Sequence, residues 1–194
     1  MHFPLFETIC IAQHQIQNIA YHQQRYENAL RHFYGKSAVK IYDFLAIIQQ
    51  SADFPTELLS PVTRCRIAYN ATDYQIQFFP YQPKLIQTFK PIVCDDIDYN
   101  FKISDRTLLN TLFAQRGDCD EIMIIKQGKV TDCSIGNLCF RRGERWFTPD
   151  SPLLAGTQRQ ALLEKGIIQE VPIFADDIED FDEIRLINAM NGLA

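Results

Sequence analysis

The sequence predicts an α+β protein. Stretches with apolar residues at helical spacing occur early in the chain and again between stretches in which apolar and polar residues alternate. Most of the expected strands follow one another across short turns, as in hairpins. The chain has 194 residues, of which 46% are hydrophobic, so it can bury the core of one large domain or of two small lobes.

The first part of the chain is expected to form two helices and then three strands. Apolar side chains recur at helical spacing in "HQQRYENALRHFYG", and Gly35 stands where that helix would end. The stretch "KIYDFLAIIQQ" predicts a second helix. The stretches "TRCRIAYN", "YQIQFFPY" and "KLIQTFKPIV" alternate apolar with polar residues and predict strands.

The rest of the chain is expected to alternate between strands and short helices. Ser104 or Asp105 is expected to cap a helix that carries an apolar face, with Gly117 behind it. The stretches "EIMIIKQGKVTDC" and "NLCFRRGERWFTP" each predict two strands joined by a turn with glycine. "GTQRQALLEKG" predicts a short helix that ends at Gly166. "IIQEVPIF", "DDIEDF" and "EIRLINAM" predict strand, helical turn and strand.

Composition and charge exclude several classes of function. The net charge of −5 and the absence of a run of Lys or Arg argue against a nucleic-acid partner. No stretch is long and apolar enough to span a bilayer, and the first residues lack the pattern of a signal peptide. The six cysteines are dispersed, without a CxxC pair or neighbouring histidines, which argues against a metal site and a disulfide scaffold. We therefore expect a soluble protein of the cytoplasm.

A few residues are candidates for chemistry. Lys102 stands among apolar and aromatic residues in "DYNFKIS", and Asp132 ends a strand that is expected to be buried. Thr157 and Gln158 lie at the start of an expected helix, where backbone N–H groups favour an anion, and Arg25 lies beside the apolar stripe of the first helix. Read singly, each residue has an ordinary structural explanation. Together they match pyridoxal phosphate: an amine for an imine, an acid for the ring nitrogen and donors for a phosphate.

Five blocks of the sequence resemble, in order and spacing, those of the class IV aminotransferases. The blocks are "HQQR", "NFKISDR", "EIMIIKQGKVTDCSIGN", "FTPDSPLLAGTQRQALLEKG" and "LINAMNG". This family of fold-type IV pyridoxal-phosphate enzymes includes branched-chain and D-amino-acid aminotransferases and 4-amino-4-deoxychorismate lyase. The resemblance runs from about Leu5 to the C-terminus and is most specific from Lys102 to Arg159. It implies a homodimer of chains with two α+β lobes, residues 1–90 and 91–194, and the cofactor in the cleft between the lobes.

The resemblance also implies roles for individual residues. Lys102 matches the Schiff-base lysine, which moves a proton at Cα of the amino substrate. Asp132 stands where the family usually has Glu, paired with the pyridine nitrogen, and is one methylene shorter. The phosphate contacts fall on Arg25, Thr157, Gln158, Asn188 and Ala189. No metal site is implied.

Three functions remain open at this point. An aminotransferase is the first expectation, and 4-amino-4-deoxychorismate lyase, which eliminates pyruvate, is a close alternative favoured by "KISDR" and by Cys133 after the acid. The third is a family member that binds pyridoxal phosphate, or a protein partner, without turnover. It is suggested because the family's segment ahead of "FET" is absent and the sequence stops soon after "NAMNG". The retained Lys102 argues against it.

Residues of the expected strands before residue 90 have an open role in binding a substrate carboxylate. They are Arg64, Arg66, Tyr69 and Tyr74. His22 is expected to support the first helix rather than to touch the substrate. The alternative for the two arginines is that they are solvated residues on a strand.

Overall fold

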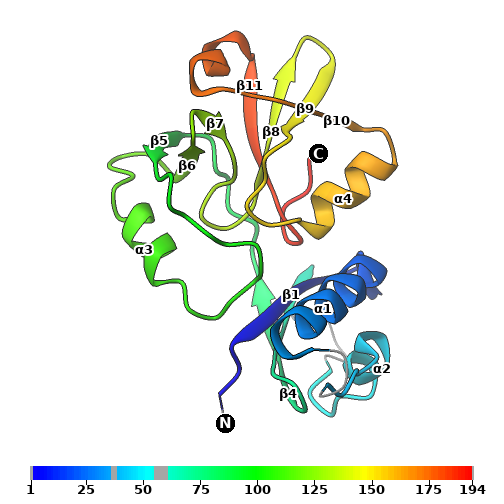
Figure 1. Cartoon of the computed structure of the whole chain (residues 1–194). Coiled ribbons are helices and arrows are strands. Elements are labelled where there is room, and N and C mark those ends of the chain that lie inside the picture. Colours follow the sequence, from blue (N-terminus) through cyan, green and yellow to red (C-terminus); the bar gives the residue numbers. More distant parts are fainter. Residues whose placement is uncertain (1, 36–38, 55–60, 194) are drawn as a thin grey trace. The chain divides into compact units, whose positions relative to one another are not determined.

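The chain forms two compact units, each with its own sheets and helices (Figure 1). The computed structural model describes residues 2–35, 39–54 and 61–193. The first unit comprises Met1–Pro83 and Phe101–Asp105, and the second comprises Lys84–Asn100 and Arg106–Ala194. The expected α+β class is confirmed. Within the described part of the chain, no helix is long and apolar enough to cross a membrane.

The first unit is built on an antiparallel sheet in the order β2-β1-β3-β4. Its elements are β1 (Leu5–Ala12), β2 (Gln15–Ile16), α1 (Ile19–Tyr34), α2 (Phe44–Gln49), β3 (Val62–Tyr69) and β4 (Tyr74–Tyr81). Both helices and the last two strands confirm the sequence-based expectations. Strand β1 is not predicted from the sequence, because Glu7 interrupts the row of Leu5, Ile9 and Ile11 that forms the buried face of this strand.

Helix α1 packs on one face of this sheet through an apolar stripe. Tyr26, Ala29 and Leu30 are three and four positions apart and are all buried. The ring of Tyr26 stacks on Phe44 of α2 at 4.2 Å between centroids and meets Tyr69 of β3 edge-on at 4.7 Å. This aromatic cluster joins α1, α2 and the sheet into one core.

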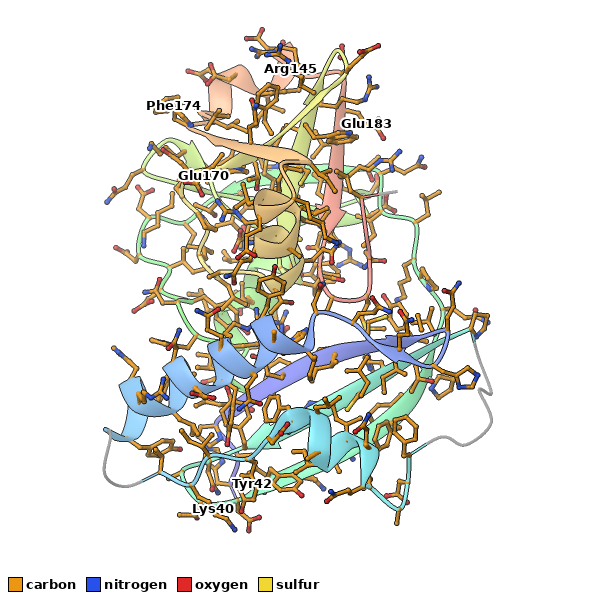
Figure 2. All side chains as sticks on the ribbon, turned by 90° about the vertical axis from the view of Figure 1, so that its right-hand side faces the viewer. Lys40, Tyr42, Arg145, Glu170, Phe174 and Glu183 are labelled. Atoms are coloured by element: carbon orange, nitrogen blue, oxygen red, sulfur yellow. The ribbon has the colours of Figure 1, made fainter. Side chains whose placement is uncertain are left out.

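The segment that leads into α2 is fixed by the hydroxyl of Tyr26. This hydroxyl donates to the carbonyl of Lys40 and accepts from the backbone N–H of Tyr42, both at 3.2 Å. The Lys40 ammonium lies over the Tyr42 ring, 4.5 Å from its centroid, and both side chains can be followed in Figure 2.

The second unit holds two sheets. A three-stranded sheet, β5-β6-β7, comprises β5 (Phe89–Val93), β6 (Glu121–Lys126) and β7 (Lys129–Val130). A four-stranded sheet, β10-β9-β8-β11, comprises β8 (Asn137–Arg142), β9 (Arg145–Pro149), β10 (Ile168–Val171) and β11 (Glu183–Ile187). The helices are α3 (Thr107–Phe113), α4 (Thr157–Glu164) and the 3-10 helix η1 (Ala175–Asp180). These elements confirm the expected order of strands and short helices.

The Gln-Gly turn between β6 and β7 is formed as predicted. Gln127 has φ of 51° and Gly128 has φ of 76°, so both central residues are left-handed, as a two-residue hairpin requires.

The expected cap of α3 is wrong. The helix begins after Arg106, whose side chain makes no capping bond, rather than after Ser104 or Asp105. Ser104 is held elsewhere, because its hydroxyl donates to the carbonyl of Phe3 at 2.7 Å and its backbone N–H donates to Pro4 at 2.7 Å. These bonds attach residues 101–105 to the first unit, ahead of the start of β1.

Candidate functional site

The first unit buries a carboxylate between a histidine and an arginine. Glu7 of β1 and His22 of α1 are both fully buried, and Arg25 of α1 has 15% of its side chain exposed. The Glu7 carboxylate accepts from Arg25 through Nε (2.8 Å to Oε1) and Nη2 (2.5 Å to Oε2). It also accepts from His22 Nδ1 at 2.7 Å. The two-point contact fixes the plane and direction of the Arg25 guanidinium.

The electrostatics of this cluster keep Glu7 charged. Burial alone would raise the pKa of Glu7, but the charge of Arg25 and the hydrogen bonds from His22 and Arg25 outweigh it and lower the pKa to about 2. Burial lowers the pKa of His22, so this imidazole is neutral at pH 7. Because a carboxylate only accepts, Nδ1 of His22 carries the proton.

Lys102 is attached to the strand that carries Glu7. The backbone N–H of Phe6 donates to the carbonyl of Lys102 at 3.1 Å, and Leu5 forms a β-bridge with Ile103. The Lys102 ammonium lies over the Phe6 ring, 4.9 Å from its centroid. Arg25 and Lys102, far apart in the sequence, are thus both held by neighbouring residues of β1.

The second unit buries a different carboxylate, that of Asp132. Asp132 is 5% exposed and follows β7. Oδ1 accepts from Asn137 Nδ2 at 2.8 Å, and Oδ2 accepts from the backbone N–H of Leu154 at 2.9 Å. Burial raises the pKa of Asp132, and although these donors and the charge of Arg159 lower it, the net pKa is about 6.

Asp132 has no cation of its own within the described part of the chain. Among the described residues, no Lys, Arg or His forms an ion pair with its carboxylate. Arg159 acts on Asp132 only through space, because its guanidinium donates to the carbonyl of Pro149 at 2.9 Å and pairs with Glu170, which is labelled in Figure 2. A buried carboxylate that is ionised at pH 7 and lacks a cation is a strong indication of a functional site.

Asn137 links Asp132 to the start of α4. Its side-chain N–H groups donate to Asp132 and to the carbonyl of Leu154. Gly156 is the N-cap of α4, and a Cβ built there would lie 1.8 Å from Asn137 Oδ1. Only glycine therefore lets Asn137 lie this close to the N-terminus of α4, where Thr157 begins the helix.

The loop Asp132–Asn137 also contacts the turn that follows β11. A Cβ on Gly136 would lie 2.5 Å from the carbonyl of Ile187, and Asn188 Nδ2 donates to the carbonyl of Ile135 at 3.1 Å. Asn188 Oδ1 accepts the backbone N–H groups of Met190 and Asn191, both at 2.9 Å. This side chain therefore shapes the turn in which Ala189 lies.

The predicted site residues fall into two groups. Arg25 and Lys102 belong to the first unit. The second unit gathers its group around the Asp132–Asn137 loop, at the start of α4 and in the turn after β11: Asp132, Thr157, Gln158, Asn188 and Ala189. Sequence reasoning missed Glu7 and Asn137. The signal for Glu7 was an acid in the mainly apolar row "LFETICI". The signal for Asn137 was the amide side chain at the end of "DCSIGN".

The described residues hold no cluster suited to a metal. No group of three or more His, Cys, Asp or Glu side chains is placed to bind an ion in this part of the chain.

The chain is similar to known proteins along its length. The sequence model of the family "Amino-transferase class IV" matches residues 100–194. An uncharacterised protein of Haemophilus influenzae is 63% identical over 191 residues, which cover 98% of this chain and 100% of that protein. The crystal structure of a "putative 4-amino-4-deoxychorismate lyase" from Haemophilus somnus is 57% identical, has a TM-score of 0.95 and covers 100% of this chain and 99% of the other.

More distant structures share the fold. A "hypothetical aminotransferase" from Mycobacterium tuberculosis, solved in a pyridoxal-phosphate-bound form, is 16% identical with a TM-score of 0.71, covering 98% of this chain and 78% of the other. The two-unit fold, the sequence match and the close relatives agree with the resemblance carried by the sequence blocks. The chain belongs to the class IV aminotransferase family, whose members are pyridoxal-phosphate-dependent enzymes.

Proposed function

We propose that this protein uses pyridoxal phosphate to move a proton at Cα of an amino substrate, with 4-amino-4-deoxychorismate lyase activity as the first candidate. The observation that carries the proposal is the buried Asp132 carboxylate, which has a pKa of about 6 and no cation among the described residues. A protonated pyridine ring supplies a cation of the kind that such a carboxylate lacks. The residues present therefore fit the cofactor.

The roles of the reacting residues follow from their chemistry. When bound, pyridoxal phosphate supplies an electron sink that makes the proton at Cα acidic. Lys102 provides the amine that carries the cofactor covalently and that then takes the proton from Cα and returns it. Asp132 keeps the ring nitrogen protonated, and Asn137 and Leu154 hold Asp132 in place.

The family resemblance supports five residues as contacts of the phosphate group. Arg25 offers a guanidinium whose direction is fixed by Glu7. Thr157 and Gln158 offer backbone N–H groups at the positive end of α4. Asn188 and Ala189 bring in the turn after β11: the backbone N–H of Asn188 donates to the carbonyl of Asn191 at 3.0 Å and fixes this turn, so the contact is assigned to the backbone N–H of Ala189.

One close relative is the reason for placing the lyase reaction ahead of transamination. The breadth of the family favours an aminotransferase by a small margin, whereas "KISDR" and Cys133 favour the lyase. The 57% identical relative over the full chain carries the lyase name, whereas the M. tuberculosis aminotransferase, at 16% identity, supports the fold alone. Purified protein with pyridoxal phosphate tests the choice: 4-amino-4-deoxychorismate should yield pyruvate. Transfer of amino groups from D- or L-amino acids to a keto acid, without pyruvate from 4-amino-4-deoxychorismate, would reverse the assignment.

We propose that the protein is a cytoplasmic homodimer. The dimer is supported by the family resemblance, and the location by the six cysteines, which are all free thiols in the structure. Light scattering of the cofactor-loaded protein should give twice the chain mass of 22.5 kDa. A single-chain mass would contradict the dimer.

Borohydride reduction of the cofactor-loaded protein should label Lys102. The amine that carries the cofactor becomes a stable secondary amine, which peptide mapping locates. Lys126 is the matched control, because its ammonium donates to the carbonyl of Ile97 at 2.7 Å in the second unit. A label on Lys126 or on another lysine would refute the assignment of Lys102. Lys102→Ala should retain noncovalent cofactor binding and lose turnover by several orders of magnitude.

Substitution Arg25→Ala should weaken binding of pyridoxal phosphate. Loss of one charge-assisted contact costs about 1.5–3 kcal/mol, which is roughly a ten- to hundredfold loss of affinity. Because the variant also leaves Glu7 buried without its cation, the double variant Glu7→Gln/Arg25→Ala separates the loss of the phosphate contact from the loss of stability. Titration of the cofactor into both variants measures the effect. Parental affinity in the double variant would exclude a phosphate contact from Arg25.

Asp132 should make the cofactor-free protein less stable as the pH rises. The pKa of Asp132 is about 6 in the folded protein and 3.8 in its ordinary state. The folded state therefore binds more protons, and the stability that this confers is complete below pH 3.8 and is lost through pH 6. The loss amounts to about 3 kcal/mol at about 1.4 kcal/mol per pKa unit.

Urea denaturation of the parent and of Asp132→Asn between pH 4 and 8 measures this loss. The amide also removes one accepted hydrogen bond, but that cost does not change with pH. The stability of the parent relative to the variant should therefore decline from pH 4 to pH 7. A difference that stays constant with pH would show that the pKa of Asp132 is not raised.

A further inference from the structure

The backbone that carries Asp132 leaves its sheet in a bulge. The carbonyl of Ile124 in β6 accepts from the backbone N–H of Thr131, and the N–H of Ile124 donates to the carbonyl of Asp132, both at 2.9 Å. Two successive residues thus oppose one, as in a β-bulge. Asp132 then forms a bridge with Asn137, so the residues between them make a tight turn. Ser134 is buried in this turn, and its contacts therefore bear on the position of Asp132.

Glu121 holds the hydroxyl of Ser134. It is the first residue of β6 and is 1% exposed. Its Oε2 accepts from Ser134 Oγ at 2.8 Å, and its Oε1 accepts from the backbone N–H of Ile122 at 2.8 Å. Burial raises the pKa of Glu121, and the hydrogen bonds from Ile122 and Ser134 and the charge of Arg106 lower it. The Ser134 hydroxyl is thus bound to an acceptor that the strand itself holds in place.

Arg106 holds the carbonyl of the same serine. Its Nη2 donates to the Ser134 carbonyl at 2.7 Å, and its Nη1 donates to the hydroxyl of Tyr99 at 3.3 Å. A guanidinium presents its N–H groups in one rigid plane, so the two contacts fix Ser134 relative to Tyr99. We call the contacts of Glu121 and Arg106 with Ser134 the Ser134 clamp.

Arg106 also joins the two ends of the segment that carries Lys102. Tyr99 lies shortly before Lys102 in the chain, and Arg106 lies shortly after it. Residues 101–105, between them, belong to the first unit, whereas Tyr99 and Arg106 belong to the second. The hydrogen bond between these two side chains therefore joins the points at which the Lys102 segment leaves and re-enters the second unit.

We propose that Arg106 and Glu121 are positioning residues, which act through Ser134 to fix the loop that presents the Asp132 carboxylate to the cofactor ring. Arg106 fixes, by the same side chain, both ends of the segment that carries Lys102. The proposal rests on the proposed function, because Lys102 and Asp132 are the residues assigned there to the cofactor.

The need for a clamp follows from the way in which Asp132 is held. Its two oxygens accept from Asn137 and from the backbone of Leu154, so the carboxylate keeps both donors only while the turn keeps its shape. A displacement of about 1 Å at a reacting group costs on the order of a hundredfold in rate. Two charged side chains on one buried serine restrain such a displacement.

Titration of Asp132 in the cofactor-free protein tests the clamp without turnover. In protein that is isotope-labelled at the aspartate carboxyl carbons, NMR follows each carboxyl group with pH, and Asp132→Asn identifies the signal. The pKa of Asp132 in the parent should be about 6. Ser134→Ala removes the contact with Glu121, and Arg106→Gln removes the contact with the carbonyl. Each should lower the pKa of Asp132 by about one unit or more, because a loosened loop lets water reach the carboxylate.

The sign of the shift separates position from charge. Loss of the Arg106 charge would by itself raise the pKa of Asp132, whereas exposure to water lowers it. Ser134→Ala changes no charge at all. Glu183→Gln is the matched control, because Glu183, which is labelled in Figure 2, accepts from Arg141 and Arg185 in the same unit. This control should leave the pKa of Asp132 unchanged.

The cofactor-loaded protein gives a second measurement. In Ser134→Ala and Arg106→Gln, kcat should fall about ten- to a hundredfold, while affinity for pyridoxal phosphate should change less than about threefold. The reason is that a misplaced Asp132 weakens stabilisation of the transition state more than binding of the cofactor.

Several results would overturn the proposal. One is an unchanged pKa of Asp132 in both variants, and another is a pKa that rises in Arg106→Gln and stays constant in Ser134→Ala. An equal fall in Glu183→Gln would show a general loosening of the fold, and a parent pKa near 3.8 would show that the loop leaves Asp132 in water. If the parent binds no pyridoxal phosphate, the proposed function fails, but the titration of the cofactor-free protein still decides whether the clamp positions Asp132.

Discussion

The second unit is organised around the carboxylate of Asp132, which is buried without a cation among the residues that the structure describes. An ionised group in such a place is costly unless hydrogen bonds and a partner charge compensate it. The loop around Asp132 supplies the hydrogen bonds, through Asn137 and the backbone of Leu154, and leaves the partner charge to be supplied from elsewhere. The same constraint requires glycine at position 156, because a Cβ there would displace the side chain of Asn137, which holds Asp132.

The first unit handles its buried carboxylate in the opposite way. Glu7 receives a full guanidinium and an imidazole N–H, and its pKa falls to about 2, whereas that of Asp132 rises to about 6. The two acids therefore lie in different environments. Glu7 is neutralised within the fold and fixes the direction of Arg25, whereas Asp132 has no ion-pair partner among the described residues. The two environments move the pKa values of the two buried acids in opposite directions. Such a difference between two acids of one protein indicates that they have different roles.

The sequence was sufficient wherever local rules and packing agree. Helix α1 and the Gln-Gly hairpin follow from periodicity and turn chemistry, and the burial of Asp132 follows from its place at the end of an apolar strand. Prediction failed where distant residues decide. Glu7 breaks the apolar pattern by which β1 would have been predicted. An acid is stable on this buried face only because Arg25 and His22 donate hydrogen bonds to it. The N-cap of α3 is Arg106 and not Ser104, because Ser104 forms hydrogen bonds to Phe3 and Pro4, about one hundred positions earlier.

The sequence resemblance aligns Asp132 with the family's usual Glu, and the loop around Asp132 fixes this shorter acid in position. An aspartate has one rotatable bond fewer than a glutamate, so less side-chain entropy is lost when it is fixed. Both of its oxygens are fixed by donors, one of which is the backbone of Leu154, so its position is set by the loop and not by a flexible side chain. Gly136 brings that loop against the carbonyl of Ile187, and Asn188 ties it to the turn after β11. The position of the shorter acid is therefore set by a backbone that is itself held by close contacts and hydrogen bonds.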